Sequence, residues 1–380
     1  MTSSPAHTAT ARPFVPAMTG LRAICAYGIF FYHLNMFSRE RNPELFRFTD
    51  QFYSFIPFFF VVSGFVICYT YYRDTKYDRT QWRNYFVSRV ARIFPLLIIL
   101  NILVFTLAWR EGLYTMGESV KLFLLNITLL KGFSSDYLLT GVGPSWTNSV
   151  EEIFYLLAPV FFVLLRRRFF FIITLLCCYA AGLIITFIFR QAPFEGFFSS
   201  YTFTAYFTFF GRIFEFLCGM YLALWYMGIK KNPVPASWNR AMLPAGLVLL
   251  AICFFLQYFI SRYYQVEHAN QVWPGIAVNN FLFPVGISLL LYGLLYSRSW
   301  LGRFLSWKPM VQLGNATYSF YLLHTTFVLS YIHKYISHNL LVTFICMMII
   351  AFLVYKCVEQ PLARLVKKIF SVPVSPQKTG

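Results

Sequence analysis

Arg22 and His33 stand eleven residues apart inside the apolar stretch LRAICAYGIFFYHLNMF, residues 21–37. At about 100° per residue, this spacing is three helical turns plus about 20°, so one helix face carries both side chains, about 16 Å apart along the axis. Charged residues inside apolar helices are costly and usually face a cavity or a partner. The pair predicts a channel lining with Arg22 near a membrane boundary and His33 near the middle, unless Arg22 is a snorkelling anchor and His33 a hydrogen-bonded interior residue.

Two carboxylates open the apolar run of SWTNSVEEIFYLLAP, residues 145–159. Ser149 and Glu152 fit a helix capping box, which explains Glu152 structurally and leaves Glu151 unexplained. A carboxylate beside a histidine favours its charged form and orients it as a general base. We therefore expect Glu151 or Glu152 to act with His33, and the candidate cavity-lining residues around them are Trp146, Asn148 and Ser149.

Arg89 and Arg92, in RNYFVSRVARIFP, are three residues apart and share a helical face beside a predicted span. Arginine pairs bind phosphate well because their planar donor forks match its oxygens. Positive charge that anchors a span at the cytoplasmic boundary explains the same pair equally simply. Both interpretations remain open at the level of sequence.

Two further polar sets lie inside predicted spans. Arg212 and Glu215 are at i and i+3, which favours a structural ion pair that neutralises itself. Thr317, Tyr321 and His324 are at i, i+4 and i+7, so they form one polar stripe on an apolar helix. That stripe predicts either contacts between helices or the lining of a cavity.

The elements that must position these residues are membrane helices. Of 380 residues, 58% are hydrophobic and 12% charged, about half the charged fraction of a soluble domain. A membrane helix needs about 20 mostly apolar residues. This predicts an all-α bundle of about ten transmembrane helices, at 19–38, 52–72, 92–109, 149–165, 169–189, 205–227, 242–260, 276–297, 313–333 and 339–357. The stretch 120–130 is too short to span and predicts a re-entrant or interfacial helix.

Lys and Arg set the expected orientation. With the N-terminus inside, 20 of them fall in inner segments, including Arg166, Arg167, Arg168 and Lys378, and nine in outer ones. Both termini are therefore expected in the cytoplasm. The start of the chain is polar and has no h-region of a signal peptide. We expect a cytoplasmic segment at 1–18, one membrane domain at 19–362 and a cytoplasmic tail at 363–380.

Other partner classes fit the sequence poorly. The net charge of +18 is scattered over short loops without a nucleic-acid-binding module, so no nucleic-acid partner is expected. All eight cysteines fall inside predicted spans without C-x-x-C spacing. They are typical of small buried apolar residues, and we expect neither a disulfide framework nor a metal site.

Taken together, the motifs resemble integral membrane acyltransferase family 3 from about Leu21 to Leu362. Arg22 and His33 match its R-x10-H, FFFVVSGFVI with Ser63 resembles its F-F-V-L-S-G-F, and Arg89 and Arg92 resemble its R-x-x-R. SWTNSVEEIFYLLAP is similar to W-S-L-S-V-E-E-Q-F-Y-L, TYSFYLLHTTF to S-Y-S-I-Y-L-L-H, and VEQP to the closing E-x-P. The chain departs from the family at Pro57, where many members carry an aspartate; Asp50 lies nearby.

The resemblance implies ten transmembrane helices and transfer of an acyl group, usually acetyl, from cytoplasmic acyl-CoA to a hydroxyl of a carbohydrate or related acceptor. It implies that Arg22, His33, Glu151 and Glu152 are catalytic. It also implies that Arg89 and Arg92 bind the CoA phosphates. We expect His33 to be a general base or a transient acyl carrier. No metal is expected.

The favoured acceptor is a surface polysaccharide such as lipopolysaccharide O-antigen or exopolysaccharide, in a bacterial cytoplasmic membrane. Alternatives are a small molecule, a lipid-linked intermediate or peptidoglycan as acceptor. A proton-coupled transporter that uses His33, His324 and the glutamates is a further alternative.

Overall fold

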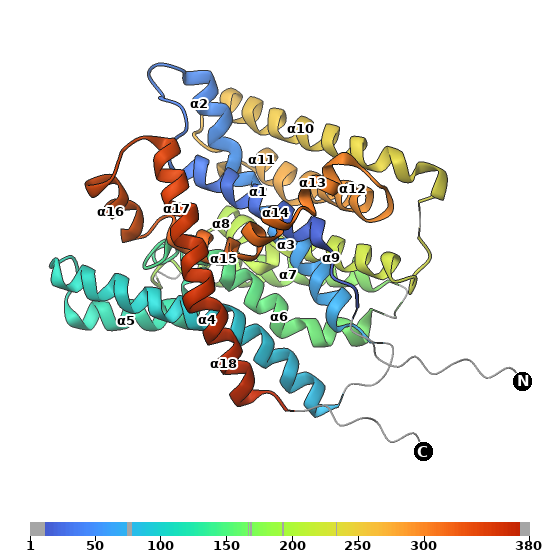
Figure 1. Cartoon of the computed structure of the whole chain (residues 1–380), viewed down its shortest axis with the longest axis horizontal. Helices are drawn as coiled ribbons and strands as arrows, with labels where there is room; N and C mark the ends of the chain where they lie inside the picture. The colour runs from blue at the N-terminus through green and yellow to red at the C-terminus, as the bar shows by residue number, and fades with distance from the viewer. Residues whose placement is uncertain are drawn as a thin grey trace, which may run out of the picture.

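The computed structural model describes residues 12–73, 78–165, 167, 169–191, 194–232 and 234–372. Arg166, Arg168 and Lys378, which contribute to the predicted charge asymmetry, lie outside this range. Helices make up nearly all the regular structure described, apart from an isolated β-bridge between Ser134 and Phe197. The all-α prediction is confirmed (Figure 1).

Eight helical segments of the described chain are long and apolar enough to cross a membrane. Several combine shorter helices end to end. They are α2 (Pro43–Thr49) with η1 (Asp50–Phe55) and α3 (Ile56–Tyr71); α4 (Arg79–Arg110); η3 (Gly143–Ser145) with α6 (Trp146–Leu164); α7 (Phe170–Phe189); α8 (Tyr201–Phe207) with α9 (Phe209–Tyr226); η4 (Ala236–Trp238) with α10 (Asn239–Tyr264); α11 (Trp273–Ala277) with η6 (Val278–Leu282) and α12 (Phe283–Tyr296); and α17 (Leu340–Val354) with η7 (Tyr355–Glu359) and α18 (Gln360–Phe370). The chain is a multi-pass membrane protein.

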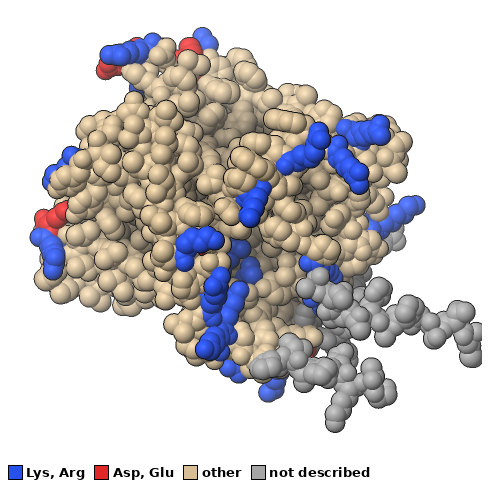
Figure 2. Space-filling model, in the orientation of Figure 1, with Lys and Arg blue, Asp and Glu red and all other residues tan. Residues whose placement is uncertain are grey.

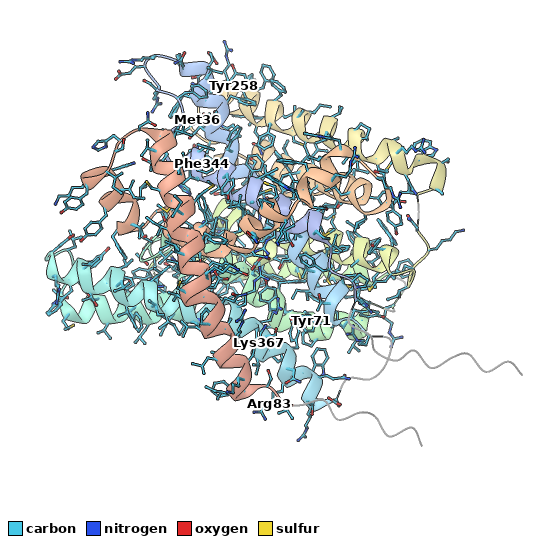
Figure 3. All side chains as sticks on the ribbon, in the orientation of Figure 1. Met36, Tyr71, Arg83, Tyr258, Phe344 and Lys367 are labelled. Carbon is cyan, nitrogen blue, oxygen red and sulfur yellow. The ribbon has the colours of Figure 1, made fainter. Side chains whose placement is uncertain are left out.

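The first predicted span, 19–38, corresponds to α1 (Pro16–His33), which ends five residues earlier than expected. It is helical but not among the eight apolar segments, because Arg22 and His33 interrupt its hydrophobic sequence. In Figure 1, α1 runs through the middle of the bundle. We call the two ends of the molecule the Arg22 end and the His33 end. Figure 3 shows Tyr71, Arg83 and Lys367 near the first and Met36 and Tyr258 near the second.

The prediction of one continuous helix at 313–333 is wrong. The chain there forms α14 (Lys308–Asn315), α15 (Thr317–Leu323) and α16 (Phe327–Tyr335), preceded by α13 (Trp300–Leu305). The break after Leu323 has a local cause, because the hydroxyl of Thr326 donates to the Leu323 carbonyl and accepts from the backbone N–H of Val328. His324 is therefore the C-cap of α15 rather than the middle of a longer helix.

Close helix contacts fix the arrangement around α3. A side chain at Gly64 would come within 2.2 Å of the Phe216 carbonyl oxygen on α9, and one at Gly219 within 2.0 Å of the Val61 carbonyl oxygen on α3. Small residues let membrane helices approach this closely. The glycine of the SGF motif is thus a packing residue, and its neighbour Ser63 is aimed at α6.

The stretch predicted to be re-entrant or interfacial forms α5 (Met116–Ile127), which packs on α4 and is not among the eight spans. Thr115 and Glu118 form its capping box. After it, η2 (Leu130–Phe133) places Lys131 inside the protein, where its ammonium donates to the carbonyls of Thr140 and Val142 at 2.8 and 2.9 Å. Burial lowers the pKa of Lys131 to about 7.

Basic residues collect on α18 at the Arg22 end. Arg364, Lys367 and Lys368 are exposed there, on a helix that packs against the first turns of α4. Figure 2 shows Lys and Arg side chains gathered over this part of the surface. The eight cysteines are all free.

Candidate active site

A cavity between α1, α3, α4, α6 and α15 lies at the Arg22 end. It consists of two small compartments with volumes of about 40 and 30 Å³, and both are lined by Arg22, Phe59, Arg92 and Glu151. Three residues predicted from separate motifs therefore meet at one place. The cavity has polar residues from several helices and an apolar wall, which is the usual composition of a small-molecule site.

The charges in this cavity are only partly balanced. Arg22 interacts electrostatically with Arg92, Glu151 and Glu359. Glu151 accepts a hydrogen bond from the Tyr155 hydroxyl at 2.8 Å, and that hydroxyl is 2.9 Å from Ser63 Oγ. The Tyr155 hydroxyl has one proton and donates it to Glu151, so its oxygen accepts the hydrogen bond from the Ser63 hydroxyl. Glu151 is thus held beside the two arginines.

Arg89 and Arg92 have different surroundings. Arg89 donates to the Tyr71 hydroxyl at 3.0 Å, and its guanidinium lies 5.2 and 5.6 Å from the ring centres of Tyr71 and Tyr155. Arg92 lines both compartments, and no carboxylate among the described residues forms a salt bridge with it. Arg92 is thus better placed than Arg89 to bind an anion that enters the cavity.

The predicted capping box of Ser149 and Glu152 is wrong. Helix α6 begins at Trp146, so Ser149 already lies inside the helix, and its N-cap residue Ser145 makes no side-chain cap bond. Ser149 instead packs against Gly132, where an added Cβ would come within 2.3 Å of the serine Cβ. Glu152 is half-buried and interacts electrostatically with Glu151 and Arg89.

Of the other predicted lining residues on α6, Asn148 lines the larger compartment and Trp146 does not. Asn148 Nδ2 lies 3.5 Å from the Tyr318 hydroxyl. Trp146 is 5% exposed and packs edge-on against Phe207, with 5.0 Å between ring centres. Trp146 is therefore a packing residue in the core of the bundle.

Tyr321 and His324 connect this cavity to the His33 end. Tyr321 lines the larger compartment and accepts a hydrogen bond from Thr147 at 3.3 Å. Its ring centre is 5.6 Å from that of His324, which in turn is 5.1 Å from that of His33. Tyr321 and His324 form a layer between the cavity and His33, and His33 itself is exposed.

The tautomer of His324 follows from its contacts. Its side chain is fully buried, and Nδ1 donates to the Tyr321 carbonyl at 2.8 Å. Nε2 is then a free acceptor, and no partner for it is present in the described part of the chain. His324 is thus a neutral base beside His33.

A second histidine that the sequence did not single out lies near His33. His268 Nδ1 donates to Asp50 at 2.7 Å, and its Nε2 lies 3.3 Å from the Tyr32 hydroxyl. The ring of Tyr32 is 4.6 Å from that of His33. The sequence predicts Glu151 or Glu152 as the carboxylate partner of His33, but Glu151 lies beside Arg22. At the His33 end, the carboxylate of Asp50 instead binds His268.

Arg212 and Glu215 form an ion pair with 3.0 Å between Nη2 and Oε1, and both side chains are fully buried. Arg212 also donates to Asn280 at 2.6 Å and lies over the rings of Phe60 and Tyr206. Neither residue lines the cavity. The pair holds α9 against η6 and α3.

Sequence reasoning missed three contributors to these sites. Glu359 stands in the quoted E-x-P motif, accepts from Ser319 at 2.5 Å and interacts with Arg22 and Arg92. Tyr155, four residues after Glu151, was available from helical spacing. His268 had no local signal, because its partner Asp50 is 218 positions away.

A family model described as an acyltransferase domain matches residues 15–355, nearly the whole chain. The chain belongs to acyltransferase family 3. This confirms the resemblance seen in the sequence motifs. No solved structure matches the chain.

Several bacterial relatives are similar to this chain at low identity. The "Putative peptidoglycan O-acetyltransferase YrhL" of Bacillus subtilis (strain 168) is 26% identical over 82% of this chain and 48% of its own length. "Peptidoglycan O-acetyltransferase OatA" of Listeria monocytogenes is 22% identical over 83% of this chain and 50% of its own. The "Putative O-acetyltransferase SACOL0978" of Staphylococcus aureus (strain COL) is 23% identical over 85% and 52%. The chain spans about half the length of these relatives.

Proposed function

We propose that this protein is a membrane-bound O-acyltransferase that moves an acetyl or short acyl group from acyl-CoA to a hydroxyl of a cell-surface carbohydrate. The observation that carries the proposal is the arrangement along α1. Arg22 lines a cationic cavity at one end of this helix, and His33 joins a histidine cluster at the other. Membership of an acyltransferase family disfavours the transporter alternative.

The Arg22 end is the proposed cytoplasmic side. Exposed basic residues on α18 and at the start of α4 collect there, as expected for cytoplasmic segments of membrane proteins. With α1 and the broken segment 308–335 added to the eight apolar spans, the chain crosses the membrane ten times. Both termini then lie in the cytoplasm, and the proposed location is the bacterial inner membrane.

The donor enters the cavity from this side. Arg92 binds a CoA phosphate by charge-assisted hydrogen bonds, which are the strongest kind available to it. Arg22, with Glu151 beside it, lies deeper along α1 and orients the pantetheine arm. Arg89 lines only the smaller compartment and supports its wall through contacts with Tyr71 and Tyr155.

Chemistry takes place toward the His33 end. His33 accepts the proton of the acceptor hydroxyl, the hydroxyl oxygen forms a bond to the acyl carbon, and the thioester C–S bond breaks. The released thiolate takes up the proton from His33, which regenerates the base. His324 and the Asp50–His268 pair hold His33 and Tyr32 in place. The acyl group reaches His33 by passing the layer formed by Tyr321 and His324.

Surface carbohydrate is the proposed acceptor class because the relatives are named for O-acetylation, two of them for peptidoglycan. A lipopolysaccharide or exopolysaccharide hydroxyl fits the same chemistry. A soluble small molecule or a lipid-linked intermediate would need to reach the same His33 end.

Mass spectrometry of envelope glycans tests this proposal. Cells with the wild-type chain should carry an added acyl mass on one defined sugar, and cells without the chain or with His33→Ala should lack it. Western blotting should show equal amounts of both proteins in the membrane. Identical glycan masses in all three strains would contradict the proposed function.

A further inference from the structure

A separate groove opens at the His33 end, between the C-terminal part of α4, Gly141 and α16. Its volume is about 410 Å³, and it shares no lining residue with the two compartments of the donor cavity. Its lining includes Glu111, Thr325, Ser330, Tyr331, Lys334 and Tyr335. This volume lies within the range for small-ligand sites.

Aromatic rings form one side of the groove. Tyr331 and Tyr335 are one helical turn apart on α16, with ring centres 5.7 Å apart and planes inclined by only 19°. They are 52% and 66% exposed. The two rings are stacked on each other, and their exposed faces are of the kind on which the C–H face of a sugar ring packs, because the face of an aromatic ring is electron-rich.

The rest of the groove is lined by apolar residues, mainly of α4, and by a set of polar groups. Thr325 Oγ1 is buried and has no hydrogen-bond partner among the described residues, although it lines the open groove. Such a hydroxyl is costly unless a ligand or water pairs with it. Ser330 adds another hydroxyl, and Glu111 and Lys334 add opposite charges. A ligand with several hydroxyl groups matches this set better than an acyl chain.

The groove adjoins the proposed chemistry. Thr325 directly follows His324, whose ring lies 5.1 Å from that of His33. A chain bound along Tyr335, Tyr331 and Thr325 therefore lies next to the histidine cluster, outside the donor cavity.

We propose that this groove binds the acceptor glycan, with sugar rings on Tyr331 and Tyr335 and a sugar hydroxyl paired with Thr325. This rests on the proposed function and adds a binding site for its acceptor. Arg22 and Arg92 then serve only the donor, and the two tyrosine rings and Thr325 bind the acceptor.

Acceptor kinetics of purified protein in nanodiscs test the proposal. The probes are acetyl-CoA with soluble peptidoglycan fragments in one arm and O-antigen oligosaccharides in the other. Tyr331→Ala and Tyr335→Ala should each raise the acceptor KM about 3- to 10-fold, the loss typical of one aromatic contact. Acetyl-CoA affinity and kcat at saturating acceptor should stay within twofold of wild type, and Tyr331→Trp should restore the KM.

Tyr263→Ala is the matched control, since Tyr263 is an 81% exposed tyrosine at the end of α10 outside the groove. It should leave the acceptor KM unchanged. An unchanged acceptor KM in both groove variants overturns the proposed glycan site. A rise of the acceptor KM in Tyr263→Ala equal to that in the groove variants also overturns it, because exposed tyrosines would then act only as membrane anchors. If the wild type transfers acetyl to neither acceptor, the proposed function fails together with this site.

Discussion

Arg92→Ala should weaken acyl-CoA binding because Arg92 lines both compartments of the cavity and has no salt-bridge partner within the described chain. A hydrogen bond to a charged group contributes about 1.5–3 kcal/mol. Loss of one such contact to a CoA phosphate therefore raises the Kd about 10- to 150-fold, since about 1.4 kcal/mol is a factor of ten. Arg92→Lys keeps the charge but loses the planar fork, so it should give an intermediate Kd.

Isothermal titration of detergent-purified protein with acetyl-CoA measures this effect at low and high salt. Arg83→Ala is the matched control, because Arg83 lies on the same helix, is exposed and donates to the Phe370 carbonyl at 3.0 Å outside the cavity. It removes the same charge and should change the Kd less than twofold. An acetyl-CoA Kd in Arg92→Ala equal to that of wild type would refute the assignment of the donor site.

Three further predictions follow from the other buried contacts. Asp50→Asn and His268→Gln should each slow acyl transfer about tenfold or more, because they displace Tyr32 and His33, and should leave the acetyl-CoA affinity unchanged. Arg39→Ala is the control, since it removes the exposed 3.8 Å ion pair to Glu267 on the same loop as His268. It should have no effect on the measured transfer rate. Lys131 lies outside the eight apolar spans, and burial lowers its pKa to about 7. Between pH 7 and about 10.5, the unfolded chain therefore binds more protons than the folded one. The free energy of unfolding thus rises with pH in this window. Lys131→Met should remove about 2 kcal/mol of that rise between pH 7 and 9 in thermal unfolding, whereas an identical pH slope in both proteins would exclude this role. Glu215→Gln should lower the free energy of unfolding by about 3–5 kcal/mol, because it leaves the fully buried Arg212 without its counter-charge. The double variant Arg212→Met with Glu215→Leu should be more stable than Glu215→Gln in the same melting assay.

Most helices could be predicted because hydrophobic length is a local property of the sequence. The segment 313–333 shows where this fails. Its composition is mostly apolar, but the side chain of Thr326 competes for backbone groups next to Leu323 and ends the helix there. The predicted cap at Ser149 fails for another reason, because α6 starts three residues earlier, at Trp146, and Ser149 lies inside the helix.

The donor side of the site was more predictable than the acceptor side. Arg22, Arg92 and Glu151 each lie in a motif that helical spacing or resemblance singles out, and the fold brings them to one cavity. The pair of Asp50 and His268 depends on a contact between segments 218 residues apart, which no periodicity encodes. Spacing also correctly placed Arg22 and His33 on one helix, but it could not show that Tyr321 and His324 lie between the cavity and His33.

The central claim is that binding of the donor and transfer to the acceptor occur at opposite ends of α1. The most direct test measures both activities in one variant, His33→Ala, with acetyl-CoA and the acceptor glycan in nanodiscs. We expect an acetyl-CoA Kd within twofold of wild type and no detectable acetyl transfer. Transfer at a near-wild-type rate in this variant would contradict it.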